Sequence, residues 1–316
     1  MSASTKWTED DIPDQTGRVV LVTGANAGLG FETARALAQH GAHVVMACRN
    51  ADKAAAAEAS INALAPSGSV EILLTDMADL DSVAGSAALF LAGHERLDVL
   101  INNAGIMATP HATTAQGFES QFGVNHLGHF ALTALLLPTL ISTGDGSRVV
   151  NVSSNGHRMG KMDFDDLMAE KKYRPWTAYF QSKLANLLFT SELQRRLADA
   201  AVPTIAVAAH PGGSRTELAD KSTGQGVLNF VMKATRPIAE PLFSQPAAMG
   251  ALPQLYAAVA PGVEGNDYYG PDGRGEMKGH PKKVGRTSRA RNAADAARLW
   301  DVSLDLTGAD YSGLEK

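Results

Sequence analysis

Short, nearly continuous runs of apolar and β-branched residues recur along the first two thirds of the chain. Such runs are typical of strands that are buried on both faces of a parallel sheet. They predict strands at residues 19–22, 43–47, 69–74, 99–101, 148–152 and 204–209. The longer segments between them predict helices at 29–39, 52–64, 80–94, 115–140 and 177–200. Strands that alternate with helices in this way are typical of βαβ units, in which successive strands lie parallel.

The pattern changes after His210 to a stretch rich in glycine, serine and proline. We expect residues 217–245 to form a small substrate lid with one hydrophobic face. The C-terminal extension, 246–316, is expected to contain helices at 247–259 and 290–306, a short strand near Tyr268 and Tyr269, and a basic loop at 274–291. We predict one domain over 1–316, in which residues 17–216 form the dinucleotide-binding and catalytic core. Its fold is expected to be α/β, with a single Rossmann-type doubly wound parallel sheet and helices on both faces.

Composition and charge narrow the classes of function. The chain has 316 residues, 28 basic against 33 acidic, so its net charge of −5 gives no general attraction to nucleic acid. Cys48 is the only cysteine, which excludes an internal disulfide and favours a reducing, cytoplasmic setting. The N-terminus is polar and acidic, and the longest apolar stretch, 130–141, is short and contains Pro138. We therefore expect no export signal and no membrane span.

A glycine-rich turn follows the first predicted strand, reading TGANAGLG over residues 23–30, and opens directly into a helix. Glycines at such a turn let the backbone approach a pyrophosphate, and the N–H groups at the start of the helix favour negative charge. A plain tight connection is the alternative. The next predicted strand ends in Arg49 and Asn50 and offers no carboxylate for a ribose, so Arg49, with Lys53 nearby, predicts NADP(H) as the cofactor. A merely solvated arginine is the alternative there.

Candidate catalytic groups lie on the next elements. Tyr179 and Lys183 stand four residues apart on a predicted helix and so share one face, where the ammonium group would lower the pKa of the phenol. The predicted strand 148–152 ends in Ser153 and Ser154, and a hydroxyl at that point can bind a substrate carbonyl. The carboxyl ends of the other strands contribute the sequence NNAG at 102–105, Asn125 in the following helix, and the sequence HPGGSRT at 210–216. We expect all of these to meet at one crevice.

In this order the motifs resemble those of the short-chain dehydrogenase/reductase family, from residue 17 to about 216. The resemblance rests on TGxxxGxG, an aspartate after the third strand, NNAG, an asparagine in the fourth crossover helix, the serine pair, YxxxK and PGxxxT. The long interval from Ser154 to Tyr179, the strand end CRN and the SKLAN sequence after Tyr179 are similar to the retinol-dehydrogenase-like and protochlorophyllide-reductase-like branch.

The resemblance implies a catalytic tetrad of Asn125, Ser154, Tyr179 and Lys183, in which Ser154 contacts the substrate, Lys183 binds the nicotinamide ribose and Asn125 holds a relay water. The choice of Ser154 over Ser153 rests on the resemblance alone. The predicted cofactor contacts are Gly24, Asn26, Gly28, Leu29, Gly30, Arg49, Asn50, Asp76, Met77, Asn103, Ala104, Gly105, Tyr179, Lys183, Pro211, Gly212, Ser214 and Thr216.

The predicted function is therefore that of an NADP(H)-dependent oxidoreductase that transfers hydride between the nicotinamide and a carbonyl or alcohol carbon of a small hydrophobic substrate. Two alternatives are an NADPH-dependent reductase of carbon–carbon double bonds and a non-catalytic dinucleotide sensor or scaffold. The intact Tyr179, Lys183 and Ser154 set argues against the non-catalytic alternative.

Histidines and apolar helices leave further alternatives open. His126 and His129 could share one side of a helix, but they have no third ligand at a useful spacing, so we expect packing and no metal site. His157 would either border the substrate pocket or lie in an exposed loop. The helices around Phe122 and Leu187 are apolar on more than one face, which predicts burial within the chain or pairing in a homodimer.

Overall fold

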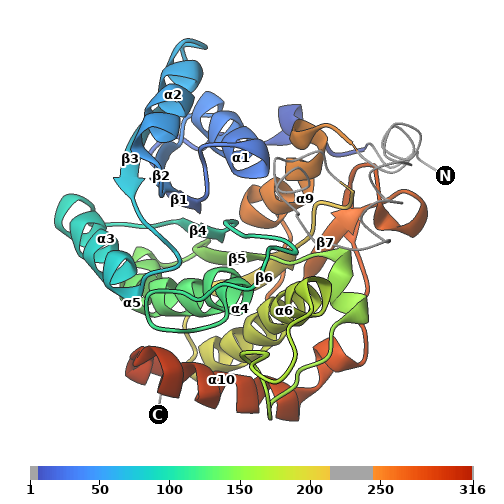
Figure 1. Ribbon diagram of the computed structural model, residues 1–316. Coiled ribbons are helices and arrows are strands. Elements are labelled where there is room, and N and C mark those ends of the chain that lie inside the picture. The colour runs from blue at the N-terminus through green and yellow to red at the C-terminus, as the bar shows by residue number, and fades with distance from the viewer. Residues whose placement is uncertain (1–5, 214–244, 315–316) are drawn as a thin grey trace.

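The computed structural model describes residues 6–213 and 245–314, and eight strands of these residues form one sheet (Figure 1). The strands are β1 (Val19–Thr23), β2 (His43–Cys48), β3 (Ser69–Leu74), β4 (Val99–Asn102), β5 (Arg148–Val152), β6 (Ile205–Ala209), β7 (Tyr268–Pro271) and β8 (Pro281–Lys283). Their order is β3-β2-β1-β4-β5-β6-β7-β8, with β8 antiparallel to β7 and all other neighbours parallel. The chain winds outward in both directions from β1 and β4, which confirms the predicted doubly wound fold.

Helices cover both faces of the sheet because side chains alternate along each strand. Val20 and Val22 of β1 pack into the core beneath α1 (Gly28–Gln39), α2 (Ala51–Asn62) and α9 (Ala247–Val259). Leu21, between them, packs into the opposite core with α3 (Leu80–Gly93) and α5 (Gly128–Thr143). In Figure 1, α6 (Pro175–Asp199) lies on this second face, and α10 (Ala293–Thr307) lies outside α6. The strands are thus covered on both sides, as their apolar composition predicts.

The long helix predicted at 115–140 begins later than expected. It starts with α4 (Ser120–Phe122), passes through a π-helical turn (Gly123–Leu127) and continues as α5. Residues 114–118 instead form a tight turn in which the Phe118 carbonyl accepts the Thr114 N–H, with Gly117 at a φ of +85°. The Glu119 carboxylate then accepts the N–H groups of Gln121 and Phe122, which fixes the start of the helix.

The C-terminal extension completes the same sheet. The strand predicted near Tyr268 and Tyr269 is confirmed as β7, but β8 was not predicted, because it lies in the segment interpreted as a basic loop. The last helix begins at Ala293 rather than 290, since the Asn292 side chain caps it. The predicted lid lies outside the described residues except for Gln245.

The apolar helices are buried largely within the chain. Helix α10 packs against α6, and Trp300 of α10 contacts the rings of Phe130 in α5 and Phe189 in α6. The helical stretch Ser120–Thr143 is long and apolar enough to cross a membrane, yet 78% of its most apolar window is buried inside the protein. Burial within the chain thus accounts for its composition, and the homodimer stays a prediction.

Three buried polar side chains join the centre of the sheet to the helices on its second face. Asn102 of β4 and Asn151 of β5 are register partners, and the Asn102 amide donates to Asn151 Oδ1 at 2.8 Å. The Asn151 amide donates to Thr190 Oγ1 in α6 at 3.0 Å. Because these groups are almost completely buried, water cannot replace a lost partner.

We therefore expect Asn151→Ala to lower the free energy of unfolding by about 1–3 kcal/mol, since it leaves buried polar groups of Asn102 and Thr190 without their partners. Urea unfolding followed by circular dichroism measures the loss. Asn62→Ala, at the exposed end of α2, is the matched control and should change the free energy by less than about 0.5 kcal/mol. Equal effects of the two substitutions would contradict the role of this network.

Candidate active site

The predicted site residues that the structure describes lie at the carboxyl ends of the central strands. The turn after β1, the end of β2, the loop after β4, the serine pair after β5 and the loop after β6 all leave the sheet at this edge. Ser214 and Thr216 lie outside the described residues. The edge is where doubly wound sheets bind their ligands, because neighbouring connections diverge there.

The glycine turn packs directly against the loop after β4. Gly24 has a φ of +68°, a conformation that favours glycine, and a Cβ atom at Gly30 would lie 2.3 Å from the Gly24 carbonyl oxygen. The Asn103 amide group donates to the Thr23 carbonyl at 2.8 Å, which joins the two loops. The start of α1 therefore keeps a bare backbone surface, which fits a pyrophosphate group.

Arg49 follows the last residue of β2 and is well placed for a second phosphate. Its side chain is 71% exposed, and its ion pair with Asp76 is 3.9 Å long. An exposed pair at this distance stabilises the fold little, so the guanidinium group is available to a ligand. The neighbouring Asn50 caps α2 by accepting the Lys53 N–H, and Met77 packs against Gly128 of α5.

Asn125 lies in the π-helical turn and holds the loop after β4 against α6. Its Oδ1 accepts the Ile106 N–H at 2.8 Å, while its amide donates to the Ile106 carbonyl and to Ser182 Oγ, both at 2.9 Å. A Cβ atom at Gly105 would lie 3.1 Å from Asn125 Oδ1 and 3.3 Å from Lys183 Nζ. The loop, the turn and the lysine therefore meet around Gly105.

The two adjacent serines have different surroundings. Ser153 is 2% exposed, and its hydroxyl donates to the Lys183 carbonyl at 2.8 Å. Ser154 is only partly buried; its hydroxyl accepts the Gly156 N–H at 3.0 Å and lies near enough to Tyr179 to lower the pKa of the phenol. Ser153 thus stabilises the backbone of α6, and Ser154 faces Tyr179.

Tyr179 and Lys183 lie on one face of α6, as predicted. Lys183 is buried and donates to the Val152 carbonyl at 3.1 Å, and burial lowers its pKa to about 8. Burial also raises the pKa of Tyr179, and this effect exceeds the opposing effect of Ser154. The net shift in the chain itself is therefore upward, opposite to the lowering that we predicted from Lys183.

Glu276, in the segment interpreted as a basic loop, joins the loops after β5 and β6. Its carboxylate accepts the Nε2–H of buried His210 at 3.1 Å and pairs with Arg158 at 2.9 Å. The Gly212 N–H donates to His210 Nδ1, which fixes that ring as the neutral Nε2–H form. The hydrogen bond from His210 is the main reason that the pKa of Glu276 falls to about 2. Only the excess of positive charge around Glu276 could have singled it out in the sequence.

The three other histidines that the sequence analysis considered, His126, His129 and His157, are buried. His126 bonds to Ser303 and His129 to Thr23, which agrees with the polar packing predicted for them. His157 is fully buried and hydrogen-bonds the Ser154 carbonyl at 2.7 Å, so the exposed-loop alternative is wrong. Burial lowers the pKa of His157 to about 4, and the ring stays neutral behind the serine loop.

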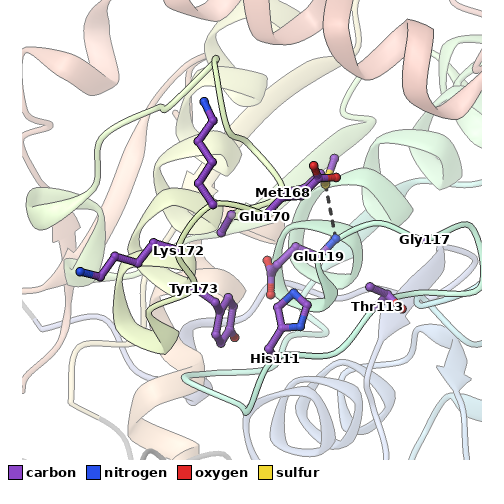
Figure 2. A pocket seen from close by; sticks show the side chains of 10 residues that line it. His111, Thr113, Gly117, Glu119, Met168, Glu170, Lys172 and Tyr173 are labelled. Carbon is purple, nitrogen blue, oxygen red and sulfur yellow. Dashed lines mark hydrogen bonds between the residues drawn. The ribbon is translucent and has the colours of Figure 1, made fainter.

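A pocket of about 370 Å³ lies between the loop after β4 and the segment that precedes α6 (Figure 2). Figure 2 shows the buried Glu119 carboxylate directed toward His111 and Tyr173. The Tyr173 hydroxyl donates to the Thr109 carbonyl and accepts from the Gln121 amide, both at 2.8 Å. The long Ser154–Tyr179 interval therefore folds over the loop after β4, which sequence reasoning did not predict.

Comparisons with known proteins agree with this geometry. Residues 18–225 match the profile of the family described as short chain dehydrogenase. Human retinol dehydrogenase 12 is 43% identical over 292 residues, covering 92% of this chain and 87% of the relative. Mouse polyprenol dehydrogenase is 40% identical over 301 residues, covering 94% of this chain and 86% of the relative. The crystal structure of an uncharacterized protein from Mycobacterium paratuberculosis is 46% identical, has a TM-score of 0.80 and covers 97% of this chain and 99% of its own.

The Glu276 contacts predict a pH-dependent stability. The folded pKa of about 2 lies below the unfolded value of about 4.3, so the stabilisation is complete above pH 5 and is lost as the pH falls toward 2. Glu276→Gln should lower the free energy of unfolding by about 1–3 kcal/mol at pH 7 and by progressively less between pH 5 and pH 3. Denaturant unfolding of the wild type and the variant at pH 7 and at pH 3 measures this difference, with exposed Glu170→Gln as the control. A difference that is independent of pH would refute the ionic contribution.

Proposed function

The chain belongs to the short-chain dehydrogenase family, and on this premise we propose that it transfers hydride between NADP(H) and the carbonyl or alcohol carbon of a small hydrophobic substrate. The family match and its relatives identify a retinol-dehydrogenase-like oxidoreductase that acts on CH–OH and C=O groups. The proposal of hydride transfer with NADP(H) rests on one arrangement. Ser154 faces Tyr179 beside buried Lys183, and these side chains lie at the same edge of the sheet as a backbone surface suited to a dinucleotide.

Tyr179 is the proposed proton donor in the reductive direction. Because burial raises the pKa of its phenol, Tyr179 is neutral near pH 7 and holds a proton that it can give to a substrate oxygen. Ser154 donates a second hydrogen bond to that oxygen and stabilises the charge that develops there. Bound NADPH would supply the hydride.

Lys183 serves the same reaction as a buried cation. One of its N–H groups is held by the Val152 carbonyl, and its other donors lie near Gly105 and Asn125 Oδ1. Its position suits contact with the ribose hydroxyls of a nicotinamide nucleotide, the role that the family resemblance implies. Asn125 has three hydrogen bonds to the protein, so we assign its side chain chiefly to positioning the loop after β4.

The preference for NADP(H) over NAD(H) is supported by the end of β2. Arg49 offers an exposed guanidinium group there, and the strand end CRN carries no carboxylate to accept a ribose hydroxyl. A guanidinium group binds a phosphate dianion through charge-assisted, bidentate hydrogen bonds.

An apolar substrate is supported by the relatives and by the surroundings of Tyr179. The relatives named for retinol and for polyprenol act, by those names, on alcohols with long apolar chains. The rings of Trp176 and Phe180 contact the Tyr179 ring, so the phenol has aromatic neighbours. We therefore propose apolar primary or secondary alcohols and the corresponding carbonyl compounds as the substrate class.

Tyr179→Phe should lower turnover with NADPH and an apolar aldehyde by at least about 100-fold, because it removes the transferable proton. Affinity for NADPH, measured by fluorescence titration, should change little. Tyr256→Phe, on α9, is the matched control and should retain full turnover. Near-normal turnover of Tyr179→Phe would refute the mechanism. With an apolar α,β-unsaturated aldehyde as substrate, product analysis by NMR separates the allylic alcohol from its isomer the saturated aldehyde, the product expected of a double-bond reductase.

Arg49→Ala should weaken NADPH binding by about 1–3 kcal/mol, roughly 5- to 150-fold, and leave NADH binding almost unchanged. Isothermal titration with each cofactor measures both affinities. Arg291→Ala removes an exposed arginine just before α10 and controls for the change in net charge. Equal losses for NADPH and NADH would contradict the assignment of Arg49 to the 2′-phosphate.

A further inference from the structure

Two histidines and a glutamate meet at the edge of the sheet, away from the active site. His43 is the first residue of β2, Glu71 lies in the edge strand β3, and His94 caps the carboxyl end of α3. They come together near the amino-terminal ends of β2 and β3, whereas the active site lies at the carboxyl ends of the strands. We propose that His43, Glu71 and His94 bind a zinc ion.

The two imidazoles lie close to each other, and Glu71 presents a different carboxylate oxygen to each of them. The two histidine Nε2 atoms are 3.3 Å apart, and His94 Nε2 lies 3.2 Å from Glu71 Oε1. His43 Nε2 lies 3.6 Å from Glu71 Oε2. Zinc binds imidazole nitrogen and carboxylate oxygen at about 2.0–2.2 Å, so the edges of a regular tetrahedron around it measure about 3.3–3.6 Å. With one ligand atom from each residue, all three atoms lie within 4.8 Å of one another, so small side-chain rotations would bring them to zinc-binding distance.

The other ring nitrogens are already held as in known zinc sites. His94 Nδ1 donates to the Phe90 carbonyl at 3.1 Å, so in the neutral ring Nε2 carries the lone pair. His43 Nδ1 forms a 2.7 Å hydrogen bond with Ser69 Oγ, which permits the same tautomer. Metal-binding histidines commonly donate their second N–H to a carbonyl or hydroxyl in this way, since the bond fixes the ring.

A metal ion stabilises the close approach of these three side chains better than a proton does. Two Nε2 lone pairs that face each other at 3.3 Å repel, and a proton on His94 Nε2 would relieve the contacts with His43 and Glu71 but leave the His43–Glu71 contact unchanged. A metal ion contacts all three atoms at once. In the described part of the chain, the ion pairs of Glu71 are both with these imidazoles.

The donor set favours zinc over magnesium or calcium. Zinc binds imidazole nitrogen as readily as carboxylate oxygen, whereas magnesium and calcium prefer ligands that are all oxygen. The side chains of His43, Glu71 and His94 are 32%, 44% and 15% exposed, which leaves an entry path and a fourth position for water. Bound zinc would fasten the edge strand β3 to β2 and α3. The inferred role is therefore structural.

The experiment uses the full chain without an affinity tag, treated with EDTA and transferred to a buffer free of chelator. Zinc chloride is then titrated against a chromophoric zinc indicator. We expect one zinc ion per chain, and a rise of about 5 °C in the unfolding midpoint when free zinc is about 100 times its dissociation constant. NADPH affinity should be the same with and without zinc.

His94→Gln and Glu71→Gln should each weaken zinc binding by at least about 100-fold and abolish the zinc-dependent rise in midpoint. Glu71 is partly exposed, so its variant keeps the test valid if His94→Gln does not fold. His40→Gln is the matched control, because His40 lies nearby at the end of α1 but bonds to the Ala36 carbonyl outside the cluster. Absence of a stoichiometric site in the wild type, or equal zinc affinity in all three variants, would overturn the proposal.

Discussion

The hydroxyl of Thr23 holds together the two loops between which a dinucleotide would lie. It accepts the N–H groups of Asn103 and Ala104, both at 2.9 Å, and it bonds to His129 of α5. Thr23 ends β1, and the residues that it binds follow β4, so the contact spans the point where the sheet changes its winding direction. The close approach at Gly30, the position of Gly105 and thus the meeting of Asn125 with Lys183 all depend on this one junction.

Two adjacent serines have separate functions at helix α6, which carries Tyr179 and Lys183. Ser153 and Ser154 are adjacent in an extended segment, so their side chains point in opposite directions. One hydroxyl serves the backbone of α6 and the other faces Tyr179. On the far side of the serine loop, Glu276 links the turn after β5 to the turn after β6. The C-terminal extension therefore contributes to the geometry of a site whose reacting groups all precede it in the sequence.

The sequence predicted best what depends on local pattern. Strands β1 to β6 are apolar runs bounded by turns, and the Tyr179–Lys183 pair needs only helical spacing, so both were evident. The late start of the helix after Glu119 was missed because a side-chain cap and the Gly117 turn override the apolar periodicity. The lysine-rich strand β8 was missed because its partner β7 decides its conformation. Neither Glu276 nor the cluster of His43, Glu71 and His94 has a local signature. The partners of Glu276 lie 66 and 118 residues away, and the members of the cluster are between 23 and 51 residues apart.

The loop after β6 is tied to residues that lie much further along the chain. The Gln245 N–H donates to the Gly213 carbonyl, and the Gln245 side chain donates to the Pro211 carbonyl and accepts the Gly279 N–H. Gly213, Gln245, Pro211 and Gly279 thus form one closed hydrogen-bonded junction. The same loop carries His210, whose ring bonds to Glu276, so the backbone on both sides of this ring is fixed by contacts of its own. The C-terminal extension therefore holds the loop after β6 at two points, through Glu276 and through Gly279.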